Sequence, residues 1–207
     1  MTRVRLPVRM GLFLLAVLVL VAGWNETTSA QGGSYRFDKD HTAVNFSWSH
    51  VGLSRQSARI AAIDGRIEFD PAVPETSRID VVMQADSIWT GITAFDEHLK
   101  SSDYFNVAKY PLIQFRSTGV RKKSDRTGEV VGDLTIMGVT RPVTLDVIWN
   151  FSGEHPLAAI NPNYKGVYVS GFSATALLRR SDWNLSLGIP LVSDEIRLSI
   201  ETELLRQ

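Results

Sequence analysis

The sequence contains no cysteine among its 207 residues. The chain therefore forms no disulfide, carries no lipid anchor on an N-terminal cysteine and offers no thiolate ligand to a metal ion. Its fold must be stabilised by a hydrophobic core alone. The part of the chain after residue 30 is long enough to bury such a core as one domain of ordinary size.

The sequence also lacks an excess of charge of either sign, because 22 basic side chains balance 22 acidic ones. Without three arginines and one glutamate of the first 30 residues, residues 31–207 hold 19 basic and 21 acidic side chains, a formal charge of −2. No basic stripe with interleaved aromatic residues is present. We therefore expect no nucleic-acid partner.

Catalytic and metal-binding motifs are absent as well. The chain has no Gly-x-Ser-x-Gly motif, no phosphate-binding loop and no dinucleotide fingerprint. It has four histidines, His41, His50, His98 and His155, and no two of them have the spacing of a metal-binding pair. We interpret them as solvated or hydrogen-bonded side chains and expect no enzyme, no catalytic residue and no metal site. The alternative is a metal- or redox-associated exported protein that uses these histidines.

The N-terminal residues have the pattern of a secretory signal peptide. Three arginines, Arg3, Arg5 and Arg9, precede an apolar run over residues 11–22, which is shorter than the ~20 residues that span a bilayer. Small residues at 28–30 form a cleavage site, so we expect residues 1–30 to be removed. No Arg-Arg pair is present before the run, which favours the general secretory route. We expect a periplasmic or secreted protein without a stable membrane anchor.

Alternation of apolar and polar residues dominates the remaining sequence. This period of two is typical of strands with one buried and one solvated face. It occurs in about eight segments, which are residues 44–49, 63–69, 79–86, 113–117, 132–136, 143–150, 167–178 and 195–204. In the pair formed by residues 132–149, Gly138 and Pro142 bracket a tight turn. The sequence therefore predicts an all-β, antiparallel domain.

One interval interrupts this alternation, between residues 87 and 110. Its pattern is helical, and the segment Thr93–Asp96 resembles a capping box. Tyr104 and Phe105 are predicted to pack inward after it. We expect a short helical insertion around residues 93–106.

Eight antiparallel strands fit either a sandwich of two sheets or a closed barrel. Several inward positions carry large side chains, which could simply fill the core. A closed barrel of eight strands has room for one small ligand, whereas a barrel with a filled core would act only as a protein-interaction module. The alternation itself does not separate these alternatives.

Five motifs, in the same order along the chain, resemble those of the YceI-like family of periplasmic polyisoprenoid-binding proteins. The motifs lie at residues 40–46, 65–71, 98–111, 132–145 and 180–183, and the resemblance covers nearly all of residues 34–205. It implies that residues 31–207 form an eight-stranded antiparallel lipocalin-like barrel around an elongated apolar tunnel. The chain departs from the family pattern at three positions, Ala58, Phe95 and Asn184, where the family commonly has Gly, Arg and Gly.

The implied function is binding, carriage or sequestration of a long-chain isoprenoid or similar amphiphilic lipid. The implied partner is an isoprenoid lipid or an isoprenoid quinone, and a homodimer is compatible with the sequence. No cofactor is expected apart from such a bound lipid. The predicted tunnel-lining residues are Phe46, Trp48, Ile67, Phe69, Val81, Met83, Phe115, Leu134, Ile136, Leu145, Val147 and Phe172. The head-group candidates are Arg180 and His98.

Overall fold

The computed structural model describes residues 32–207. The predicted signal peptide, residues 1–30, lies outside this range, so its removal remains a prediction. Among the described residues, none of the helices has the length and apolar character needed to cross a membrane.

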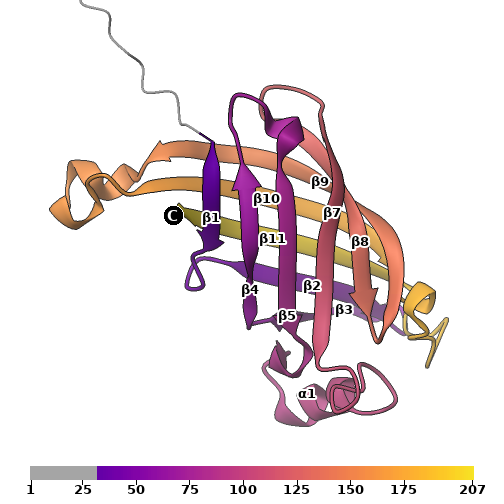
Figure 1. Ribbon diagram of the computed structural model, residues 1–207. Coiled ribbons are helices and arrows are strands. Elements are labelled where there is room, and N and C mark those ends of the chain that lie inside the picture. Colours follow the sequence, from indigo (N-terminus) through magenta and orange to yellow (C-terminus); the bar gives the residue numbers. More distant parts are fainter. Residues whose placement is uncertain (1–31) are drawn as a thin grey trace, which may run out of the picture.

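Eleven strands and one α-helix form the described part of the chain (Figure 1). The strands are β1 (Gly33–Phe37), β2 (Ala43–His50), β3 (Ser54–Ile60), β4 (Ile63–Phe69), β5 (Arg78–Gln84), β6 (Ile88–Trp89), β7 (Leu112–Lys122), β8 (Thr127–Ile136), β9 (Val139–Glu154), β10 (Tyr168–Arg179) and β11 (Glu195–Arg206). The helices are α1 (Thr93–Lys100) and the 3-10 turns η1 (Pro74–Thr76), η2 (Ala85–Ser87), η3 (Pro156–Ala159), η4 (Pro162–Tyr164) and η5 (Arg180–Trp183).

The strands form a closed antiparallel barrel. The ring runs β1-β4-β5-β7-β8-β9-β10-β11, and β11 pairs again with β1. The remaining strands extend this ring, because β2 pairs with β11 and β3, and β3 pairs with β6. Thus β1 and β2, β3 and β4, and β5 and β6 are the halves of three interrupted strands. The prediction of an eight-stranded antiparallel barrel with one short helical insertion is confirmed, and the sandwich is excluded.

The β8–β9 hairpin corresponds to the predicted pair of strands, with one difference. Its two turn residues are Met137 and Gly138, which have φ values of 50° and 73°, so a residue without a Cβ suits the second position. Pro142 does not bracket the turn but lies inside β9, opposite Asp133. Proline is tolerated there because β10 pairs with β9 only from Asp146 onward, so this part of β9 has a strand neighbour on one side.

Helix α1 begins at the expected place but without the predicted capping box. Thr93 is already helical, and the preceding Ile92 makes no side-chain cap. The carboxylate of Asp96 instead accepts hydrogen bonds from the backbone N–H and the hydroxyl of Thr90, both at 2.6 Å. The helix start is therefore tied to the segment after β6. Tyr104 and Phe105 pack inward against the core, as expected.

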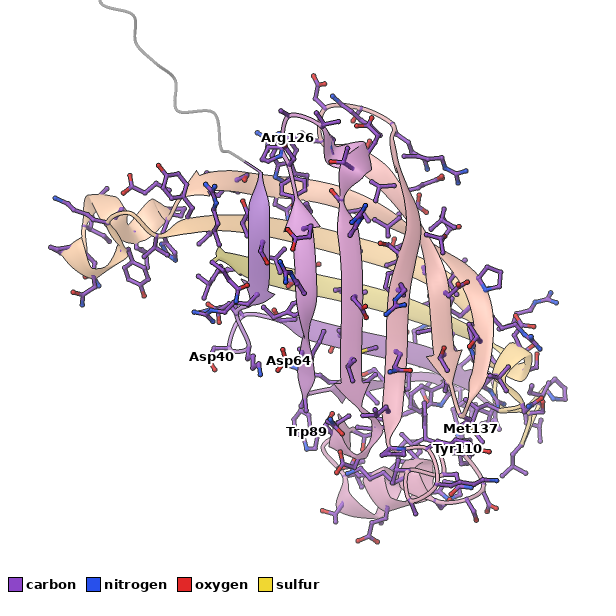
Figure 2. The ribbon with its side chains drawn as sticks, viewed as in Figure 1. Asp40, Asp64, Trp89, Tyr110, Arg126 and Met137 are labelled. Atoms are coloured by element: carbon purple, nitrogen blue, oxygen red, sulfur yellow. The ribbon has the colours of Figure 1, made fainter. Side chains whose placement is uncertain are left out.

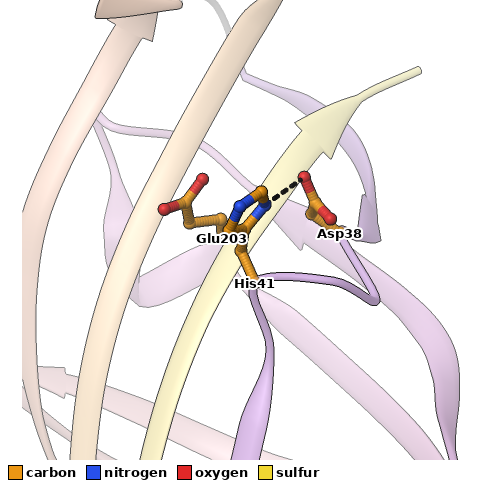
Figure 3. Close-up of side chains that lie close together, drawn as sticks. All are labelled: Asp38, His41 and Glu203. Carbon is orange, nitrogen blue, oxygen red and sulfur yellow. Dashed lines mark hydrogen bonds and ion pairs between the residues drawn. The ribbon is translucent and has the colours of Figure 1, made fainter.

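A small ionic cluster lies at the break between β1 and β2 (Figure 3). His41 Nδ1 lies 3.0 Å from a carboxylate oxygen of Asp38, and Glu203 of β11 lies beside them. The hydrogen bond to Asp38 raises the pKa of His41 above its usual 6.5, and the charges of Asp38 and Glu203 raise it further. Burial alone would raise the pKa of Asp38, but its hydrogen bonds to His41 and to the N–H of Asp40 lower it below its usual 3.8.

The pair should make stability depend on pH in a defined direction. Because the pKa of His41 is raised in the folded protein, its contribution to the free energy of unfolding is complete below pH 6.5. That contribution disappears as the pH rises through the raised pKa. The contribution of Asp38 is complete above its unfolded pKa and disappears at lower pH. We therefore expect the His41 imidazole to titrate above pH 6.5 in an NMR titration. In Asp38→Asn the midpoint should fall toward 6.5, and an unchanged midpoint would show that Asp38 is not the cause.

Candidate functional site

The barrel encloses a cavity of about 420 Å³. Its wall is almost entirely apolar and receives side chains from every described strand except β6. All twelve predicted tunnel residues line it, namely Phe46, Trp48, Ile67, Phe69, Val81, Met83, Phe115, Leu134, Ile136, Leu145, Val147 and Phe172. The alternation thus placed these side chains on the inner face correctly, and their contact with a ligand remains a prediction.

The large aromatic side chains line the cavity rather than fill the barrel. At the α1 end, Trp48 stacks on Phe46 with ring centroids 5.7 Å apart and meets the edge of Phe95 at 5.8 Å. At the opposite end, Phe69 packs edge-on against Trp149 at 5.5 Å and against Phe172 at 5.1 Å. Such edge contacts are favourable ring geometries and hold the rings against the wall. The cavity between them contradicts a completely filled core.

Phe95 occupies the position at which the family commonly has arginine. Its ring is half-buried, lines the cavity and contacts Trp48. The substitution therefore extends the apolar wall onto helix α1, and it adds no positive charge there.

The turn η5 closes the barrel beside α1. The indole N–H of the buried Trp183 donates to the carbonyl of Leu134 at 3.0 Å, which joins η5 to β8. Arg141 of β9 donates to the carbonyl of Asp182 at 3.1 Å. Asn184, which replaces the usual glycine, ends the turn with a φ of 64°, as the left-handed conformation requires. These bonds hold the end of the barrel in a fixed position.

Arg180 is buried at this end and lines the cavity. Its guanidinium donates to the carbonyls of Ser193 at 2.9 Å, Val192 at 2.8 Å and Leu185. Burial lowers the pKa of Arg180, and the nearby Tyr104 and Asp194 act in the opposite direction. Three backbone carbonyls already accept hydrogen bonds from Arg180. The structure therefore assigns this predicted head-group candidate a role in stabilising the fold, and its contact with a head group remains a prediction.

His98, the second head-group candidate, lies on the exposed side of α1 and borders the cavity. Its ring packs edge-on against Tyr104 at a centroid distance of 4.9 Å. The structure therefore brings His98, Tyr104 and Arg180 to the same end of the cavity. Their contact with a head group remains a prediction.

Arg126 is a cavity-lining cation that the sequence reasoning missed. It lies in the β7–β8 loop, at the end of the barrel far from Trp89 and Tyr110 (Figure 2). Its guanidinium lies 5.2 Å from the ring of Trp149 and donates to the carbonyl of Asn150 at 3.2 Å. Its backbone carbonyl also accepts from the N–H of Trp149. These contacts of Arg126 hold the β7–β8 loop against Trp149 at this end of the barrel. No sequence signal distinguishes it from the other loop cations.

One group of side chains in residues 32–207 has ligand atoms close enough to hold a metal ion. It is the cluster of Asp38, His41 and Glu203, whose ligand atoms lie within 4.8 Å of one another. His41 and Glu203 are exposed, and none of the three residues lines the cavity. Exposed groups of this kind commonly exist without a metal, so we do not assign one to it.

The structural role of Arg180 leads to a prediction about stability. Arg180→Met leaves three buried or half-buried carbonyls without their donor, at a cost of ~1–3 kcal/mol each. We expect a large decrease in the free energy of unfolding, measured by urea denaturation. The neighbouring Arg179 is exposed, and Arg179→Met should stay within about 0.5 kcal/mol of wild type. Equal midpoints for the two variants would refute this role.

Comparisons with known proteins agree with this architecture. The YceI-like domain family matches residues 35–204. A UPF0312 protein of Pseudomonas putida strain F1 is 34% identical over 194 residues, which cover 93% of this chain and 96% of the relative.

Two solved structures share the fold. The YceI protein of Campylobacter jejuni is 28% identical with a TM-score of 0.68, over 77% of this chain and 90% of that structure. A polyisoprenoid-binding domain from Saccharophagus degradans, implicated in plant cell wall breakdown, is 15% identical with a TM-score of 0.57, over 84% of this chain and 98% of that structure. The family match spans the barrel from β1 to β11, and the chain belongs to the YceI-like domain family.

Proposed function

We propose that this protein binds the apolar chain of a long isoprenoid or a similar amphiphilic lipid inside its barrel, without catalysing a reaction. The observation that carries this proposal is the apolar cavity of about 420 Å³ within a closed sheet. Ligand sites in proteins commonly measure ~300–1,000 Å³. The wall provides few polar groups, so the site suits a hydrocarbon chain better than a polar metabolite.

The energetics of such binding are favourable. Each methylene group that moves from water into an apolar site contributes ~0.8 kcal/mol. A few isoprene units therefore offset the translational and conformational entropy lost on binding. The rings of Phe46, Trp48, Phe69 and Phe172 are held by neighbouring rings, so the walls need little ordering when a ligand enters.

The family relationship supports the same class of ligand. The Saccharophagus degradans domain is described as polyisoprenoid-binding, although its 15% identity carries only the fold to this chain. The signal-peptide pattern of residues 1–30 supports action in the periplasm, where a carrier would shield the lipid from water.

The alternative that uses the histidines has weaker support. His41 is engaged by Asp38 outside the cavity, and His155 stacks on Tyr164 and accepts from the N–H of Leu157. Only His50 and His98 border the cavity, and they belong to different elements, β2 and α1.

The direct test is organic extraction of the purified protein followed by mass spectrometry. We expect a long-chain isoprenoid or a similar amphiphile in the extract, and a quinone would identify itself by its redox-active ring. A clean extract, together with no binding of added geranylgeraniol, would overturn the proposal. Stoichiometric zinc or iron in the same preparation would favour the alternative.

A matched pair of variants on β10 tests the location of the site. Ala174 lines the cavity and the next residue, Thr175, is exposed on the outer face. Ala174→Trp should displace at least two methylene groups of the ligand and weaken geranylgeraniol binding about tenfold. Thr175→Trp should bind like wild type. Fluorescence titration measures both affinities, and similar affinities would place the ligand elsewhere.

A further inference from the structure

Two loops at the α1 end of the barrel are joined into one surface. They are the turn between β2 and β3 and the long connection from η5 to β11. The N–H of Val51 donates to the carbonyl of Leu191 at 2.7 Å, and His50 forms a β-bridge with Val192. Ser193 exchanges two further bonds with Ser49, so the two loops have a fixed relative position.

The outer side of these loops carries exposed aliphatic side chains. Their exposed fractions are 41% for Val51, 86% for Leu53, 51% for Leu187, 37% for Ile189 and 67% for Leu191. Single exposed apolar residues are ordinary, but five of them on two bonded loops mark an interaction surface. We name these five residues the aliphatic loop patch.

The same loops lack formal charge. Residues 51–54 and 184–193 contain no Asp, Glu, Lys or Arg, although 21% of the whole chain is charged. A loop without formal charge has no ionic group to desolvate, so it can enter an apolar environment at a lower cost.

The aliphatic loop patch is continuous with the wall of the cavity. Leu185 and Val192, from the same connection, face inward and line the cavity, as does His50 at the end of β2. Their neighbours Leu187, Ile189 and Leu191 face outward. This loop, to whose carbonyls the buried Arg180 donates from the inner side, is therefore the boundary between the cavity and the outside at this end.

We propose that the aliphatic loop patch docks on the surface of a lipid bilayer, with its side chains inserted among the acyl chains. This inference rests on the proposed function, because a long isoprenoid is insoluble and resides in a bilayer before a carrier takes it up. The position of the patch argues for a bilayer as the occupant, since docking through it would bring the cavity wall at Leu185 and Val192 close to the lipid. The lack of charge agrees with insertion into a zwitterionic membrane rather than attraction to anionic lipids.

Co-sedimentation of the full barrel with phosphatidylcholine vesicles tests this inference. We expect wild type to sediment with the vesicles and added salt not to release it, because the attraction is hydrophobic. Leu53→Ser combined with Leu191→Ser should reduce binding at least tenfold, since each leucine loses much of its transfer free energy. Both side chains are exposed, so the fold should persist.

The matched control removes two exposed apolar residues from another place. Leu157 and Ile160 are exposed and lie in the connection that joins β9 to β10. This connection extends from the barrel away from the α1 end (Figure 1). Leu157→Ser combined with Ile160→Ser should sediment like wild type. Equal losses in both double variants, or no binding by wild type, would overturn the proposal.

Two further measurements separate this inference from others. Light scattering that shows a wild-type dimer and a monomeric patch variant would assign the patch to a second copy of the chain and overturn the bilayer proposal. Geranylgeraniol delivered from ethanol should still bind the patch variant, because the cavity wall is unchanged.

If wild type takes up geranylgeraniol but does not sediment, the docking inference fails alone. If wild type sediments but never takes up geranylgeraniol, the proposed function fails and the carrier role of the patch fails with it.

Discussion

The pairing of β11 with the start of the barrel is the constraint on which the rest of the structure depends. β11 pairs with β10 along almost all of its length, with β2 through residues 197–201 and with β1 through residues 204–206. These bonds remove the two edges that an open sheet would expose. They also turn every inward side chain toward a common interior, so closure converts a sheet with one apolar face into a cavity.

The groups that stabilise the end of the barrel differ from those of the proposed binding site. The motif at residues 180–183 is one of the five that carry the family resemblance, and its arginine satisfies backbone carbonyls while its tryptophan joins η5 to β8. A buried cation is expensive unless its hydrogen bonds are satisfied, and here three carbonyls satisfy them. The motif thus holds the end of the barrel, whereas the proposed binding surface consists of alternating apolar residues, which line the cavity.

Most of the fold could be predicted from alternation. The period of two assigns residues such as Leu134, Leu145 and Phe172 to the buried face of the sheet, whether the strands form a sandwich or a barrel. It does not say whether the sheet closes, because closure depends on the pairing of Tyr35 with Arg206, which are far apart in the sequence. The alternation also does not predict whether side chains fill the interior, because that depends on how the aromatic rings of facing strands pack against one another.

Local rules failed where tertiary contacts were stronger. The capping box expected at Thr93 does not form, because Asp96 accepts a hydrogen bond from Thr90 instead. This bond ties the helix to the barrel. The contacts of Arg126 and the grouping of the aliphatic loop patch were also unpredictable, because each depends on which loops meet at the ends of the barrel. Loop composition alone does not contain that information.

The meander of the chain has a consequence for assembly. If each interrupted strand is counted as one, every pairing in the ring joins neighbours along the chain except the pairing of β11 with the first strand, β1–β2, so hairpins can form one after another as the sequence proceeds. The interior, however, has no complete wall until β11 has paired on both sides. The cavity therefore does not exist during the earlier steps of folding. An apolar ligand can be enclosed only after β11 has paired on both sides.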